Sequence, residues 1–169
     1  MIRKCIIAAA LAALAVPAAA APVQPDQQAT GEALILVPLS LVKIDDLDFG
    51  TVITSPVSGT VAINATTGAR SVAGGVTGIA SDLGNRARFA GAGSPSQQVI
   101  VVVNPPAALQ NANGDQLTVL ALTLEGSPIK TIDPVTRSFT FGVGGIILVG
   151  ANQAEGDYSA LFDVTAIYQ

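Results

Sequence analysis

This 169-residue sequence has one cysteine, no histidine and no tryptophan, and only 4% of its residues are aromatic. Histidine and cysteine supply most general bases and thiol nucleophiles; histidine is absent and the one cysteine, Cys5, lies in the expected signal peptide, so the usual triads and thiol mechanisms are excluded after its cleavage. Zinc prefers the same two residue types, which argues against a zinc site. A single cysteine cannot form an internal disulfide, so the core alone must hold the fold. We therefore expect a protein that is not an enzyme and that needs no cofactor.

Residues 1–20 are typical of a secretory signal peptide. Arg3 and Lys4 provide a positive start, residues 5–16 are apolar, and the alanines at 18–20 match an A-x-A cleavage site. The apolar run is shorter than the roughly 20 residues that a membrane-spanning helix needs. We expect cleavage after Ala20, with a cut one residue to either side as the alternative, and export to the periplasm, the cell surface or the medium.

Cleavage would also change the charge of the protein. Loss of Arg3 and Lys4 would take the net charge from −4 to −6, and Cys5 would be removed with them. An acidic protein is repelled by phosphate backbones and by anionic lipid surfaces. We therefore expect no nucleic-acid partner, and no membrane span after cleavage of the signal peptide.

The rest of the chain has the pattern of a β protein. Residues 21–31 are polar and contain two prolines, which predicts a flexible tail, and residues 32–169 are expected to form one domain. No segment of that domain repeats apolar residues at helical spacing. Short runs rich in valine, isoleucine, leucine, threonine and phenylalanine instead alternate with glycine, proline, asparagine and aspartate. The expected strands, about nine plus a terminal one, are 33–37, 39–44, 47–53, 59–64, 86–91, 98–103, 117–126, 138–143, 145–150 and 156–169.

Short strands with frequent turns predict a β-sandwich of about nine strands. Val143-Gly144-Gly145 predicts a tight hairpin, and Asn113-Gly114 predicts a second turn. Residues 66–84 are rich in small polar residues and predict a long loop. Pro38 is expected to bend an edge strand, because proline cannot donate to a central ladder.

The last fourteen residues alternate most cleanly. Tyr158, Phe162, Val164 and Tyr168 share one parity and would lie on one face of a strand. We select these four as the candidate strand-pairing face, because a sheet edge can take up an additional strand. The other interpretation, an ordinary core face of a closed sandwich, stays open.

Two polar clusters are weaker signals. Asp45, Asp46 and Asp48 could bind calcium, but the spacing lacks the glycine and distal glutamate of a calcium loop, and a solvated turn is favoured. Ser127 and Lys130 formally match an S-x-x-K motif, yet its companion motifs are missing. We therefore assign no metal site and no catalytic residue.

Three stretches carry a family resemblance: PLSLVKIDDLDFGTV, the run from Arg88 that reads RFAGAGSPSQQV, and FTFGVGGIILVGANQAEGDYSALFDVTAIYQ. Together they resemble the bacterial secreted family called domain of unknown function 4402, which implies a fold but no reaction. The ending is also similar to chaperone–usher pilins and to spore-coat U-type proteins. That similarity implies an immunoglobulin-like sandwich that lacks one strand, filled by the N-terminal extension of a neighbour.

The resemblance leads to two hypotheses. The first is a secreted or surface-exposed structural or adhesive subunit, pilus- or coat-like, with self-assembly or a periplasmic chaperone as its partner. The second is a monomeric periplasmic or extracellular binding module for a small ligand or glycan. The usual pilin disulfide cannot form here, and residues 21–31 would be a poor donor strand. Residues 33–37 would be a better donor, unless they are the domain's own first strand.

Overall fold

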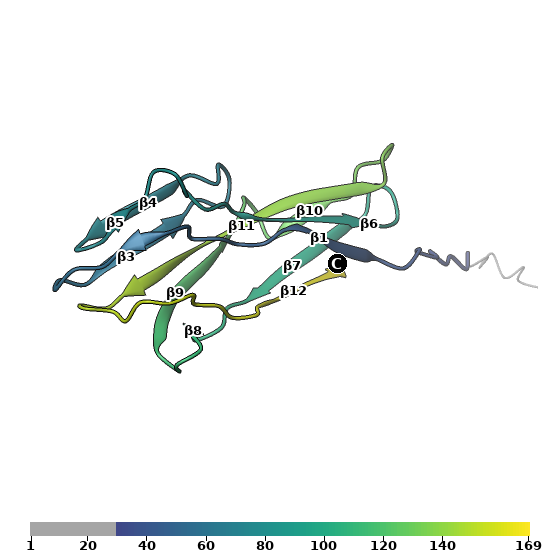
Figure 1. Ribbon diagram of the computed structural model, residues 1–169. Coiled ribbons are helices and arrows are strands. Elements are labelled where there is room, and N and C mark those ends of the chain that lie inside the picture. The colour runs from purple at the N-terminus through teal and green to yellow at the C-terminus, as the bar shows by residue number, and fades with distance from the viewer. Residues whose placement is uncertain (1–29) are drawn as a thin grey trace, which may run out of the picture. The chain divides into compact units, whose positions relative to one another are not determined.

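A computed structural model describes residues 30–169, in which twelve strands and no helix are found (Figure 1). The prediction of an all-β, sandwich-like fold is confirmed, with twelve strands instead of about nine. The expected signal peptide, and the expected tail as far as residue 29, lie outside the described residues. The chain divides into two compact units, Met1–Leu34 and Ile35–Gln169, and every strand belongs to the second. Within residues 30–169, no helix long and apolar enough to cross a membrane is present.

The strands form three antiparallel sheets. The largest follows the order β1 (Ser40–Asp45), β6 (Ala87–Ala92), β11 (Ser138–Val149), β3 (Gly59–Ile63) and β4 (Arg70–Gly74), with β9 (Gln116–Leu124) also beside β11 and β8 (Ala108–Gln110) beside β9. The second has the order β10 (Ile129–Thr131), β7 (Gln98–Asn104) and β12 (Asp163–Tyr168). A small third sheet pairs β2 (Val52–Ile53) with β5 (Thr77–Gly78).

Strand β11 is the centre of the large sheet. The hairpin predicted at residues 143–145 was wrong, because these residues lie inside this strand. It runs unbroken through Gly144 and Gly145, pairing β6 with its first half and both β3 and β9 with its second half. A Cβ on Gly144 would lie 2.2 Å from the carbonyl oxygen of Ile63. These glycines therefore permit close approach of neighbouring chains and make no turn.

The first hydrophobic cluster lies between the large sheet and the β10–β7–β12 sheet. Phe89 of β6 and Phe141 of β11 are cross-strand partners with stacked rings 5.4 Å apart. Phe139 continues the stack, and its ring covers Gly91 of the adjacent strand. The facing sheet contributes alternate side chains, which include Val99 and Val101. The buried members are Ala87, Phe89, Val99, Val101, Ile132, Phe139, Phe141 and Val143.

The second cluster lies over the other end of β11. Its buried members are Val61, Val76, Leu117, Ile147 and Val149. Irregular segments, and not a complete second sheet, lie over this cluster, through partly buried residues such as Phe49 and Tyr158. The sandwich is therefore less completely closed here than over the first cluster.

Several predicted boundaries were wrong. Residues 33–37 form no strand and are mostly exposed, so Pro38 bends none there. The terminal strand begins at Asp163, not near residue 156. The predicted loop at 66–84 contains β4 and β5. The turn at Asn113-Gly114 is confirmed: Gly114 has a φ of 91° and its amide donates to the carbonyl of Asn111.

Candidate functional site

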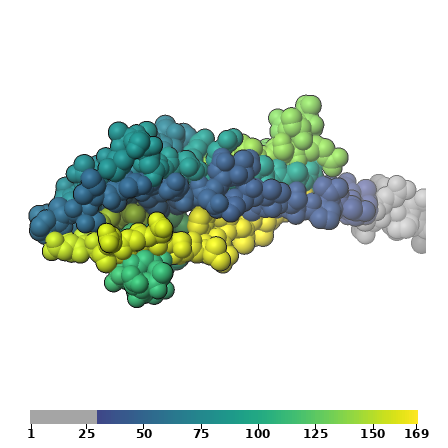
Figure 2. Space-filling view, in the orientation of Figure 1, coloured from purple at the N-terminus to yellow at the C-terminus, as the bar shows by residue number. Residues whose placement is uncertain are grey.

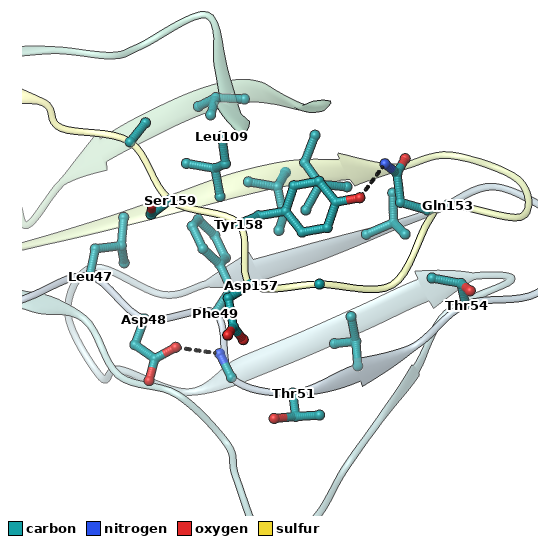
Figure 3. Close-up of a pocket in the computed structure, with 18 of the residues that line it drawn as sticks. Leu47, Asp48, Phe49, Thr51, Thr54, Leu109, Gln153, Asp157, Tyr158 and Ser159 are labelled. Carbon is teal, nitrogen blue, oxygen red and sulfur yellow. Dashed lines mark hydrogen bonds between the residues drawn. The ribbon is translucent and has the colours of Figure 1, made fainter. Parts of the chain in front are cut away.

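A cleft of about 910 Å³ opens over the second cluster (Figure 3). One wall is formed by residues 46–54 and the other by residues 153–160. Figure 2 shows these two parts of the chain, blue and yellow, side by side on the visible face. The floor is apolar and comes from β8, β9 and β11: Leu109, Leu117, Val119, Leu122, Ile147 and Val149.

The first wall is irregular because a turn interrupts it. Gly50 has a φ of 67°, a conformation that favours glycine, and the Asp48 carboxylate accepts a hydrogen bond from its amide at 2.8 Å. Asp48 also pairs through its backbone with Asn85, at 2.8 and 2.9 Å. The predicted strand at 47–53 is reduced by this turn to the two residues of β2.

Arg70 fastens this wall to the rest of the domain. Its guanidinium donates to the carbonyls of Thr51 at 3.0 Å, Ile79 at 2.6 Å and Asp82 at 2.7 Å, and more weakly to that of Phe49 at 3.4 Å. Arginine suits this role because its donors form a rigid planar fork. Local sequence patterns do not predict these hydrogen bonds of Arg70, because the accepting carbonyls lie 9 to 21 positions away.

The Asp82 side chain makes a second contact that holds the first wall in place. The Thr51 hydroxyl donates to its carboxylate at 2.5 Å. This bond, with backbone N–H groups of Gly84 and Thr51 and the charge of Arg70, lowers the pKa of Asp82 from 3.8 against the opposing effect of desolvation. The wall is therefore tied most firmly when Asp82 is ionised.

The opposite wall is held by Tyr158. Its hydroxyl donates to the carbonyl of Ala154 at 2.7 Å and accepts from the side-chain amide of Gln153 at 3.0 Å, as Figure 3 shows for the second bond. Ser159 forms an isolated bridge with Gln110. This wall has no continuous strand pairing and depends on these few contacts.

The four predicted site residues fall into two groups. Tyr158 belongs to the cleft and packs against the second cluster. Phe162, Val164 and Tyr168 are partly buried against the first cluster, with Phe162 edge-on to Phe89 at 6.4 Å. The alternation holds from residue 161 to 169, where even-numbered side chains face the core. Phe162 also lines the near end of the cleft, which connects the two groups.

Strand β12 has a free edge. Its pairing with β7 extends from Asp163 to Tyr168, and among residues 30–169 no other strand pairs with it. Strand β1 is likewise paired on one side only, with β6. The ends of β1 and β12 are close, because the Tyr168 hydroxyl donates to the carbonyl of Val37 at 2.8 Å.

The cleft is acidic at its rim. Five carboxylates line it and, among the described residues, no lysine or arginine does: Asp46, Asp48, Asp82, Glu155 and Asp157. Such a rim disfavours anionic ligands, including phosphate groups. An apolar floor under an acidic rim suits an uncharged or cationic occupant.

The residues of the two weaker sequence signals, the aspartate cluster and the Ser127–Lys130 pair, make structural contacts. Asp45 pairs with Arg88 at 3.5 Å and Asp46 with Lys43 at 2.5 Å, so these two carboxylates of the aspartate cluster make separate contacts. In residues 30–169, no group of three metal-ligating side chains is found. Ser127 accepts from the amide of Ile129, and Lys130 donates to the carbonyl of Glu125, so this pair belongs to a turn.

Residues 39–168 match the profile of the family described as Domain of unknown function (DUF4402). The chain belongs to this family. A search of curated proteins and a search of solved structures found no match. The DUF4402 match extends over every strand from β1 to β12. The apolar segment 33–37 therefore lies just outside the DUF4402 domain.

We call residues 33–37 the apolar segment. Residues 33–37 are Ala-Leu-Ile-Leu-Val, and Ile35 is 91% exposed. A short β-prone run without charge, proline or glycine readily pairs with another strand. The sequence pattern alone predicts either a strand of the domain or a donor, and in the structure residues 33–37 form no strand.

Proposed function

We propose that this DUF4402 protein is an exported, non-enzymatic structural or adhesive subunit, pilus- or coat-like, that assembles by strand pairing between copies. One observation carries the proposal: residues 33–37 form no strand and are mostly exposed, while the described part of the same chain leaves an apolar cleft without a strand across it. The apolar segment of one copy would enter the cleft of the next.

Burial of the segment supplies part of the driving force. Leu34, Ile35 and Leu36 would each contribute about 1.5–3 kcal/mol when removed from water. The total, roughly 5–9 kcal/mol, is of the same order as the entropic cost of association. Backbone hydrogen bonds to the cleft wall at residues 153–160, which has no continuous strand pairing, would supply the remainder and set the register of the incoming strand.

The setting follows from the expected signal peptide at residues 1–20, which directs the chain to the periplasm or the cell surface. Exposed apolar segments and open edges promote aggregation. A periplasmic chaperone is therefore the partner that would cover the cleft before a neighbouring copy arrives.

Deletion of residues 33–37 tests the proposal. The protein recovered after export should form oligomers whose size rises with concentration, and the deletion variant should be monomeric by light scattering. A synthetic peptide of residues 32–39 should then bind the deletion variant and raise its thermal midpoint, because a ligand that binds only the folded state stabilises it. A peptide with Ile35→Asp is the matched control. Unchanged oligomers after the deletion would refute the proposal.

A monomeric binding module is the second candidate, and the size of the cleft favours it. A volume of about 910 Å³ lies within the range of small-ligand sites. This function requires that the exported protein stay monomeric at all concentrations and that the peptide of residues 32–39 fail to bind. An uncharged or cationic ligand would then be expected, because of the acidic rim.

A further inference from the structure

Three hydrogen bonds form a closed ring where the chain enters β1. The Val37 amide donates to the Ser94 hydroxyl at 2.9 Å. The Ser94 amide donates to the Tyr168 hydroxyl at 2.8 Å, and that hydroxyl donates to the Val37 carbonyl at 2.8 Å. We call these three residues the latch. Both backbone polar groups of Val37 are thereby held by residues 57 and 131 positions away.

Burial and close packing fix the position of the latch residues. Ser94 is one of two buried polar residues in the described chain, at 7% exposure. A Cβ on Gly93 would lie 2.4 Å from the Tyr168 hydroxyl oxygen, so a side chain there would displace that group. The Tyr168 ring packs against the first hydrophobic cluster. The hydroxyl is therefore placed by packing on one side and by a glycine on the other.

The latch lies at the opposite end of β1 from the cleft. Of the residues that line the cleft, Asp46 is nine residues after Val37 and Phe162 is six residues before Tyr168, which are about 30 Å and about 20 Å of extended chain. The apolar segment extends only four residues before Val37, about 13 Å. With Val37 held, the segment cannot reach the cleft of its own domain.

We infer that Tyr168 is a positioning residue for assembly: through the latch, its hydroxyl reserves the apolar segment for a second copy. This inference rests on the proposed function. The contact it implies is head to tail, because the segment and the cleft are different surfaces of one chain. A heterologous contact of this kind extends as an open chain unless the rotation between copies closes a ring.

Tyr168→Phe tests the inference, because it keeps the ring and removes the hydroxyl. In the exported full-length protein, the half-assembly concentration should rise about tenfold, since a segment that is no longer held must be ordered on binding. Exchange of the Val37 and Ser94 amides should accelerate. In the background lacking residues 33–37, Tyr168→Phe should leave affinity for a peptide of residues 32–36 unchanged, because that peptide contains no latch residue and the cleft is intact.

The two readouts separate a positioning role from a structural one. Equal weakening of assembly and of peptide binding would show that the hydroxyl only supports the fold and would overturn the inference, as would unchanged assembly.

Ser94→Ala, which removes the acceptor of the Val37 amide, should reproduce the assembly defect if Tyr168→Phe fails to fold. Thr140→Val, on the exposed face of β11, is the control loss of a hydroxyl. Assembly without residues 33–37 would instead refute the proposed function.

Discussion

At the scale of single residues, Leu161 and Phe162 are a natural matched pair. Leu161 is 95% exposed, whereas Phe162 is partly buried and edge-on to Phe89. We predict that Phe162→Ala lowers the free energy of unfolding by about 3 kcal/mol, through lost burial and a cavity. Leu161→Ala should change it by less than about 0.5 kcal/mol. Urea denaturation measures both, and equal losses would mean that the alternation is misassigned.

Asp82 and Asp133 predict a dependence of stability on pH. Hydrogen bonds lower both pKa values from 3.8: the first mainly from the Thr51 hydroxyl, the second mainly from the backbone N–H of Thr136 and then Val135. A lowered folded-state pKa stabilises above the unfolded-state pKa, and that stability is lost as pH falls through the folded-state value. The urea midpoint should therefore fall as pH drops below about 4.

The double variant Asp82→Asn and Asp133→Asn should flatten this dependence, because the removed carboxylates can no longer bind protons. The comparison is the change in urea midpoint between pH 6 and pH 3 in the variant and in the parent protein. An equally steep loss in both would show that other groups control the acid response.

Side-chain alternation in the sequence is sufficient to predict the shared face of Phe162, Val164 and Tyr168, because a period of two is local information. It does not identify Ser94 or Arg70. Their partners are distant in sequence, up to 74 positions for the Ser94–Tyr168 bond, so no local pattern indicates these contacts. Only tertiary pairing shows what these polar groups do.

At the scale of elements, β11 provides the clearest test. A Cβ on Gly144 would meet the carbonyl oxygen of Ile63 at 2.2 Å and the amide nitrogen of Ala65 at 2.6 Å, and both atoms are backbone. We predict that Gly144→Ala costs about 2–4 kcal/mol, because a neighbouring strand must shift. Gly150→Ala, which would meet only the side-chain oxygen of Gln153, should cost less than about 1 kcal/mol. Similar thermal midpoints for the two variants would contradict the unbroken strand.

The hairpin predicted at residues 143–145 was wrong for the same reason. A glycine pair between β-prone runs locally indicates a turn, although here it admits two neighbouring backbones. The strand predicted at residues 33–37 was wrong for the opposite reason. These residues have strand composition, but a strand also requires a partner, and sequence patterns do not show whether one is present within the same chain.

At the scale of the whole molecule, composition and turn spacing are sufficient to predict an all-β, sandwich-like fold. The cleft is not predictable from them, because it arises where residues 46–54 and 153–160 fail to complete a sheet over the second cluster. The expected cleavage of the leader would leave no cysteine in the protein. Disulfide cross-linking through introduced cysteines would then have no background from native cysteines.

The most direct measurement places one cysteine in the apolar segment and one in the cleft wall, as Ile35→Cys with Ser159→Cys. If the segment of one copy enters the cleft of the next, mild oxidation should give a ladder of disulfide-linked oligomers on a non-reducing gel. Either single-cysteine variant should give dimers at most. Only monomers or dimers from the double variant would contradict the account.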